Sequence, residues 1–209
     1  MSATEQIRHV DKGVKLAQFA AECLAVCPNC SGPVMVTSES IYAVPFRPMK
    51  PKASCLKCSF EVRDNADVWF GPVTGSAKER CPECGFKWLA ATLLRKTLPK
   101  RTRHVRVTCP SCHNDVAVKI EWHFSRVGGV HDPSFGLPLW LQTSCRGETL
   151  WAYNGKHLVA LRKYVSAGLR ESTGLHWSML SRLPKWICKR ENRDSVLASI
   201  ERLRKTIPT

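Results

Sequence analysis

The sequence has no long hydrophobic run. None of its stretches approaches the roughly 20 consecutive apolar residues that a membrane-spanning helix needs. The first fifteen residues also lack the apolar core of a secretory signal peptide. We therefore expect a soluble, cytoplasmic protein that makes no membrane contact.

Acidic residues are scarce. The 209 residues include 17 Asp and Glu against 32 Lys and Arg, which gives a net charge of +15 and a pI near 9.6. Such a chain attracts polyanions at long range, although composition alone does not separate a nucleic acid from an anionic membrane or an acidic protein partner. The hydrophobic content of 44% excludes disorder throughout and fits one medium domain or two to three small ones.

The cysteines are arranged as an internal duplication. Eight of the eleven form four Cys-x-x-Cys pairs: Cys27 and Cys30, Cys55 and Cys58, Cys81 and Cys84, Cys109 and Cys112. Residues 31–54 separate the first two pairs and residues 85–108 the last two, so each cysteine of the first set recurs 54 positions later. In a reducing compartment this spacing indicates metal ligands rather than disulfides.

Each set of four cysteines matches a structural zinc site. Zinc prefers four thiolates in a tetrahedron, and a Cys-x-x-Cys turn places two sulfurs on one side of the ion. Proline follows the first cysteine in three of the four pairs, where its fixed φ favours a tight turn. The sequence therefore predicts two Zn²⁺ ions per chain, each closed to substrates and each supplying folding free energy.

Cys23, one of the three remaining cysteines, admits an alternative. Cys23, Cys27 and Cys30 spell Cys-x3-Cys-x2-Cys, the iron–sulfur signature of radical SAM enzymes. That interpretation strands Cys55 and Cys58, breaks the duplication and leaves no room for the βα barrel of such enzymes. We expect Cys23, Cys145 and Cys188 to be free, buried thiols.

Alternating valines between and after the cysteine pairs predict short strands. Val34 and Val36 alternate with polar or small residues, and so do Val105 and Val107. Residues 116–122 are typical of one strand with four apolar residues on one face. We expect a small α+β protein: tandem zinc ribbons of antiparallel β-structure, then a hairpin and a short helical C-terminal region. The predicted divisions are 1–22, a first ribbon over 23–75, a second over 76–130, and 131–209.

The last third predicts a hairpin and three helices. Two aromatic-rich runs flank a polar turn that contains Gly147. Helices are expected over 156–171, over 178–187 with a bend or an end near Pro184, and after an N-cap at Asn192. The apolar faces expected for the first and third helices are Leu158, Leu161, Val165 and Leu169, and Val196, Leu197, Ile200 and Leu203.

Several segments resemble a group of bacterial proteins described as containing a zinc ribbon of the transcription-factor-IIB type. They are the paired CPxC turns, DPSFGLPLWLQ at 132–142, ETLWAYNGKHL at 148–158 and SRLPKW at 181–186. The resemblance covers most of the chain. It implies a fold for the metal modules and little about activity.

An acid-free segment extends from Glu83 to Asp115. Its cations predict nucleic-acid contacts at Arg95, Lys96, Lys100, Arg101, Arg103 and Arg106. The alternative is a solubilising loop, although solvated surfaces usually mix charges of both signs. Nearby aromatics offer stacking surfaces for unpaired bases or, alternatively, fill the cores of small domains: Trp69, Phe70, Trp88, Trp122, Phe124 and Trp140.

No arrangement typical of an active site is recognisable. The candidates are His104, His113, His123, His131, Asp115, Glu121 and Asp132. The string at 113–115 resembles the metal-finger nucleases of the His-Asn-His type, but their further histidine ligands have no counterpart at the required spacing. The sequence thus predicts no enzyme, but a zinc-stabilised, non-catalytic nucleic-acid-binding or regulatory protein that acts on DNA or RNA. The alternatives are an adaptor that docks on a larger protein complex and a metal-dependent nuclease.

Overall fold

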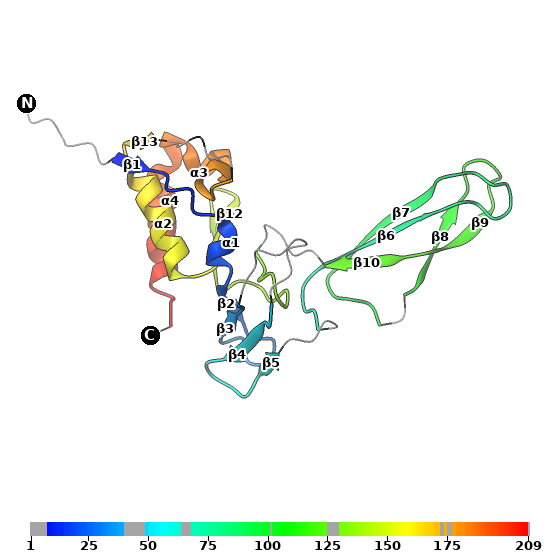
Figure 1. The fold of residues 1–209 in the computed structure, drawn as a ribbon, viewed down its shortest axis with the longest axis horizontal. Helices are drawn as coiled ribbons and strands as arrows, with labels where there is room; N and C mark the ends of the chain where they lie inside the picture. Colours follow the sequence, from blue (N-terminus) through cyan, green and yellow to red (C-terminus); the bar gives the residue numbers. More distant parts are fainter. Residues whose placement is uncertain are drawn as a thin grey trace, which may run out of the picture.

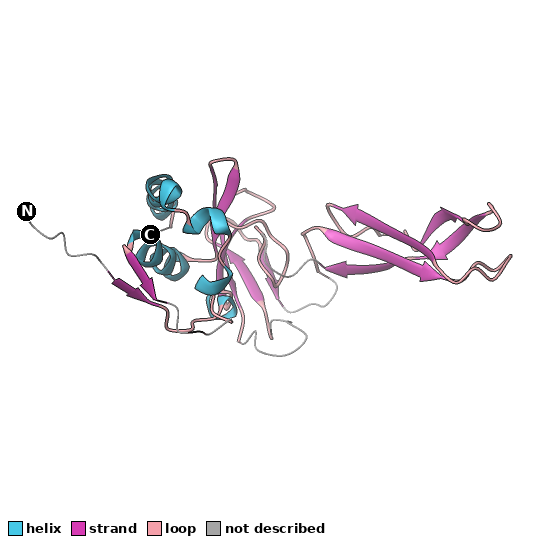
Figure 2. Cartoon of the chain, turned by 90° about the horizontal axis from the view of Figure 1, so that it is seen from above, coloured by secondary structure: helices cyan, strands magenta, loops and turns pink. Residues whose placement is uncertain are grey.

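The chain forms a body from which a long arm projects (Figures 1 and 2). The computed structural model describes residues 8–39, 49–63, 68–100, 102–124, 130–171, 174 and 177–208. The arm comprises residues 73–124, and the body contains the first four-cysteine module and the C-terminal helices. The protein is α+β, with both four-cysteine groups in antiparallel β-structure, followed by a hairpin and helices as predicted.

The first module is one antiparallel sheet. Its strands are β2 (Glu22–Val26), β3 (Pro33–Thr37), β4 (Lys52–Cys55) and β5 (Glu61–Arg63), in the order β2-β3-β4-β5. Val34 and Val36 point into the core with almost no exposed surface, as their alternation predicts. The strand β2 was not predicted. The successive residues Cys23, Leu24 and Ala25 are all buried, so both faces of β2 are covered and the alternation that reveals a half-exposed strand is missing.

The arm is built from two hairpins. In the first, β6 (Val73–Glu79) pairs with β7 (Leu89–Arg95); in the second, β8 (His104–Thr108) pairs with β9 (Asp115–Lys119). The strand β10 (Glu121–Phe124) returns to pair with β6 and completes a sheet in the order β10-β6-β7. A shared core of apolar side chains lies between the hairpins.

The single strand predicted over 116–122 is wrong, because the chain changes partner at Ile120. The backbone N–H of Ile120 donates to the carbonyl of Arg103, and the next residue starts β10 against β6. A Cβ on Gly75 would lie 2.5 Å from Ile120 and 2.8 Å from Trp122. Glycine in β6 therefore makes room for the two side chains that cross it, a long-range fit that local alternation does not reveal.

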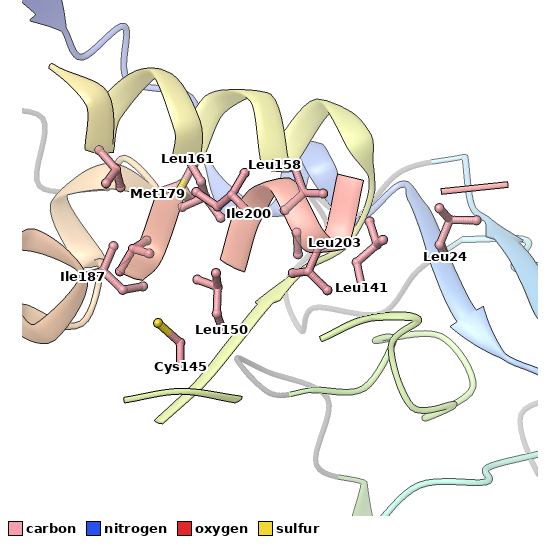
Figure 3. Packing of buried hydrophobic residues seen from close by; sticks show 13 residues of the cluster. Leu24, Leu141, Cys145, Leu150, Leu158, Leu161, Met179, Ile187, Ile200 and Leu203 are labelled. Atoms are coloured by element: carbon pink, nitrogen blue, oxygen red, sulfur yellow. The ribbon is translucent and has the colours of Figure 1, made fainter. Parts of the chain in front are cut away.

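The predicted hairpin after the arm is present. It consists of β11 (Leu141–Cys145) and β12 (Glu148–Ala152), joined by Arg146 and Gly147, both with positive φ. Two positive φ values make a turn whose twist matches that of the strands. The helices α2 (Gly155–Ser166) and α4 (Arg193–Arg204) pack on this hairpin around the main apolar core (Figure 3).

The helix predicted over 156–171 ends early, at Ser166. Leu169 is 44% exposed and starts β13 (Leu169–Glu171), which pairs in parallel with β1 (Arg8–Val10). Pairing with a strand from the other end of the chain overrides the helical periodicity here.

The remaining helices follow the predicted pattern. Pro184 separates the 3₁₀ turn η1 (Leu180–Arg182) from α3 (Lys185–Cys188), and a second 3₁₀ turn, η2 (Arg190–Asn192), precedes α4. Asn192 precedes α4 as predicted, but its side chain donates to the carbonyl of Trp186 instead of capping. The short α1 (Leu16–Phe19) packs on the body. No helix in the described part of the chain is long and apolar enough to cross a membrane.

Candidate metal centres and basic surface

The first four-cysteine group joins two turns of the first module. Cys27 and Cys30 lie in the turn between β2 and β3, whereas Cys55 ends β4 and Cys58 lies in the turn before β5. The sulfur of Cys27 is 3.7 Å from that of Cys58, and the sulfur of Cys30 is 3.5 Å from that of Cys55. All four sulfurs lie within 4.8 Å of one another.

The second group repeats this geometry in the arm. The sulfur of Cys81 is 3.7 Å from that of Cys112, and the sulfur of Cys84 is 3.6 Å from that of Cys109. The first cysteine again faces the last, and the second faces the third. The duplication seen in the spacing is therefore a duplication in three dimensions.

The distances between sulfurs fit metal binding and exclude disulfides. A disulfide bond measures about 2.0 Å, and all eleven cysteines are free. Four sulfurs at about 2.3 Å from one ion form a tetrahedron with edges of about 3.8 Å. Two sulfur–sulfur distances in each group, 3.5 to 3.7 Å, are close to this value, and all others lie within 4.8 Å. Each group can therefore hold one metal ion with four thiolates, and no coordination position stays open for a substrate.

Backbone hydrogen bonds and positive φ values shape three of the four cysteine turns. Ser31, Gly85 and His113 each lie four residues after the first cysteine of a pair, and each has φ between 56° and 71°. Their N–H groups donate to the carbonyls of Cys27, Cys81 and Cys109. His113, a candidate for catalysis in the sequence, is thus a turn residue.

Backbone N–H groups also favour the thiolate form that metals require. The N–H of Phe86, with the neighbouring thiols, lowers the pKa of Cys84 to about 7. Burial raises the pKa of Cys55, but the N–H groups of Lys57 and Cys58 outweigh it and lower that pKa to about 6. One thiol of each group therefore ionises readily near neutral pH.

The three other cysteines lie outside both groups. Cys23 is fully buried and donates to the carbonyl of Ala20, and burial raises the pKa of its thiol. Cys145 is buried in β11. Cys188 is half-buried, with its sulfur 3.6 Å from the hydroxyl of Tyr164.

The predicted basic segment covers residues 95–106. Its central part, residues 96–103, forms the connection between β7 and β8, which we call the basic loop. Arg95 lies opposite Val73, where the arm begins, so the loop lies at the body end of the arm and the cysteines lie at the far end. Trp122 anchors the loop by donating its indole N–H to the carbonyl of Thr102. The predicted contact residues that are exposed are Arg95, Lys96, Lys100, Arg103 and Arg106. Arg101 lies outside the described residues.

The described cations of the arm form no ion pair with a described acid. Residues 73–124 contain ten Lys and Arg against four Asp and Glu. Every ion pair formed between described residues lies in the body, for example Lys156 with Glu22 at 3.0 Å and Arg162 with Glu201 at 3.0 Å. The positive charge of the arm is therefore exposed to the solvent and is not neutralised by any acid among the described residues.

The acids and histidines considered for catalysis are dispersed. Asp132 is fully buried, and its carboxylate accepts N–H bonds from Ser134, Phe135 and Leu137 at 2.6 to 2.9 Å. His131 lies beside it in the same loop, where burial lowers its pKa. Within the described ranges, the two cysteine groups are the only sets of three or more His, Cys, Asp or Glu that could share a metal ion.

The other candidates lie apart along the arm. Asp115 accepts a bond of 2.7 Å from the hydroxyl of Thr108, and Nε2 of His123 lies 3.0 Å from the hydroxyl of Ser76. His104 and Glu121 are exposed on β8 and β10, which belong to different sheets.

The loop held by Asp132 joins arm and body, a role that the sequence analysis missed. The carbonyl of Phe135 accepts the N–H of Phe70, just before the arm begins. Gly136 has φ of 72° and lies close to Gly71, because a Cβ added to Gly136 would be 2.6 Å from the backbone nitrogen of Gly71. An Asp followed by Pro, Ser and a Gly is a turn signal that could have located this loop, though not its partners.

The aromatic side chains near the modules mostly fill cores. Trp69 is buried and Phe70 packs edge-on against Phe60, while Trp122 and Trp140 are half-buried. Among these candidates Trp88 is the exception, since 61% of it is exposed, and the ammonium group of Lys78 lies 4.1 Å from its ring centre.

Comparisons with protein-family models, with curated proteins and with solved structures return no match for this chain. The features that indicate a function are therefore the geometry of the two cysteine groups and the charge of the arm.

Proposed function

We propose that this chain is a zinc-stabilised, non-catalytic nucleic-acid-binding or regulatory protein, with one Zn²⁺ in each cysteine group. Thiolates are soft ligands, and a closed tetrahedral site with four of them suits zinc. The arm encloses a small core of six buried residues, so metal binding and folding of the arm are one event.

The observation that carries the binding proposal is the unneutralised charge of the basic loop. Its described cations are exposed, and the sequence between Glu83 and Asp115 contains no acid. None of these cations forms an ion pair with a described residue. Flexible cations attract phosphates without reading bases, because the phosphate backbone supplies most of the sequence-independent affinity. The loop lies where the arm leaves the body, and its described cations are exposed, so that a polyanion can reach them.

A matched pair of triple variants tests the proposal. Fluorescence anisotropy with labelled DNA and RNA at low salt should show that Lys96→Ala, Lys100→Ala and Arg103→Ala together weaken binding at least tenfold. The control removes the same charge from exposed sites of the body, by Lys163→Ala, Lys185→Ala and Arg190→Ala, and should change affinity much less. Equal effects of the two variants would show that net charge alone acts, and no binding by the unmodified chain would refute the proposal.

The adaptor function is the second candidate, and two exposed apolar side chains of the arm favour it. Trp88, directly before β7, is 61% exposed, and Leu94, within β7, is 73% exposed. Exposed apolar residues of this size are typical of protein contacts. An adaptor should retain its partner after nuclease treatment and should lose it on Trp88→Ala and Leu94→Ala, while the basic-loop variant keeps it.

A further inference from the structure

One face of the arm combines cations and small side chains with no large aromatic ring. It is the outer side of the β8–β9 hairpin, which we call the ribbon face. Its residues are the outward-pointing members of both strands: His104, Arg106, Thr108, Asp115, Ala117 and Lys119. All six are exposed, and the valines that alternate with them point into the core of the arm.

The strand register separates the charges on this face. His104 lies opposite Lys119, and Arg106 lies opposite Ala117, at the end next to the basic loop. Asp115, the single acid of the face, accepts the hydroxyl of Thr108 at the end next to the cysteines. Among the described residues, neither Arg106 nor Lys119 has a side-chain partner, so both can donate to a ligand.

The hairpin is also held rigidly. The β6–β7 hairpin backs it from behind, and Cys109 and Cys112 tie its turn to the second metal group. A rigid ribbon presents its donors at fixed spacing and loses little side-chain and backbone freedom on binding.

We propose that the ribbon face enters the major groove of double-stranded DNA, with Arg106 and Lys119 directed to base edges and the basic loop on the phosphates. This inference rests on the nucleic-acid binding proposed above. The major groove is about 12 Å wide and admits a two-stranded ribbon. Outward side chains on one strand repeat every 6.8 Å or so, which is about two base-pair steps.

The side chains match groove chemistry better than the alternatives. Arginine donates to the N7 and O6 acceptors of guanine, and the methyl groups of Ala117 and Thr108 suit the thymine methyl group. The major groove of an RNA duplex is too narrow for side chains to read. Single strands are bound by aromatic stacking, for which the ribbon face has no large ring.

The test compares two double variants of the full, metal-loaded chain. Arg106→Ala with Lys119→Ala removes two cations from the ribbon face. Lys78→Ala with Arg80→Ala removes two exposed cations from the β6 side of the arm. Duplex DNA affinity should fall about tenfold or more for the first and about threefold at most for the second. Circular dichroism and metal content should be unchanged for both.

Chemical changes in the DNA separate groove reading from charge. Replacing guanine by 7-deazaguanine removes a major-groove acceptor, and should weaken the unmodified chain but not the Arg106→Ala, Lys119→Ala variant. Equal losses for both double variants, indifference to 7-deazaguanine, or tighter binding to duplex RNA or single strands would overturn the groove inference and leave nucleic-acid binding intact. Absence of binding to every nucleic acid would overturn both proposals.

Discussion

Trp69 stacks on Phe124, with ring centres 4.9 Å apart and ring planes within 11° of parallel. Trp69 precedes the first strand of the arm and Phe124 ends its last strand, so this pair closes the arm at its base. The indole N–H of Trp69 donates to the carbonyl of Pro72 at 3.0 Å, which fixes the ring. The stack thus joins the two ends of the arm where the arm meets the body.

Loss of this stack should destabilise the protein. We expect Trp69→Ala to lower the free energy of unfolding by about 3 kcal/mol, because a large buried ring is replaced by a cavity. Trp69→Phe keeps a ring and should cost about half as much. Urea unfolding followed by fluorescence of the remaining tryptophans measures both. A change below about 0.5 kcal/mol for Trp69→Ala would show that the arm is not closed by this contact.

The carboxylate of Asp132 should be essential to the joining loop. Asp132→Asn replaces an acceptor oxygen by an amide NH2 group that faces backbone N–H groups, so we expect the free energy of unfolding to fall by about 2 kcal/mol or more. Glu148→Gln is the control, since it makes the same chemical change at an exposed site. The same urea titration applies. If both substitutions had equal effects, the three short bonds to Asp132 would contribute nothing specific.

Metal content should separate ligand cysteines from free ones. The purified chain should carry two zinc ions by native mass spectrometry. Cys30→Ser and Cys84→Ser should each leave one ion, whereas Cys23→Ser should keep both, because its hydroxyl can replace the thiol as donor to Ala20. One ion in the unmodified chain, or iron with visible absorbance, would be incompatible with two zinc modules.

The sites and turns whose residues have a fixed spacing in the sequence could be predicted from the sequence. Four coincident offsets of 54 residues are enough to identify Cys27 and Cys81 as members of equivalent sites. The hairpin at Gly147 and the break at Pro184 likewise depend on backbone rules that act within a few residues.

Features that depend on distant partners could not be predicted. The strand β2 forms a bridge with Leu139, and Leu169, predicted to be helical, pairs with Arg8 in a parallel sheet. The change of sheet at Ile120 requires Gly75 in β6, which lies 45 residues earlier in the sequence. The basic segment was located by composition, but its position at the base of the arm follows only from the register of β6 and β7.

Acid should destabilise the body through His157. Its ring stacks on Phe19, touches Trp151 and Tyr153, and accepts the backbone N–H of Tyr153. Burial lowers the pKa of His157 from 6.5 to about 4, and burial also keeps the Tyr153 hydroxyl protonated by raising its pKa. Between pH 6.5 and about 4, His157 is therefore protonated in the unfolded chain but stays neutral in the folded chain.

The stability that neutral His157 provides is complete above pH 6.5 and is lost as the pH falls toward 4. By pH 5 the loss should reach about 2 kcal/mol. His157→Phe should remove this part of the pH dependence, while protonation of the metal thiolates affects both proteins alike. Urea unfolding at pH 7 and pH 5 gives the difference. Parallel losses in the two proteins would mean that His157 titrates normally.

The salt dependence of nucleic-acid binding tests the central claim most directly. Each phosphate contact contributes about 0.7 to 0.9 to the slope of log affinity against log salt concentration. The Lys96→Ala, Lys100→Ala, Arg103→Ala variant should therefore have a slope flatter by about two to three units than the unmodified chain, with unchanged zinc content. The control variant Lys163→Ala, Lys185→Ala, Arg190→Ala should keep the original slope. Identical slopes for the unmodified chain and the basic-loop variant would contradict the account, because the loop would then contact no phosphates.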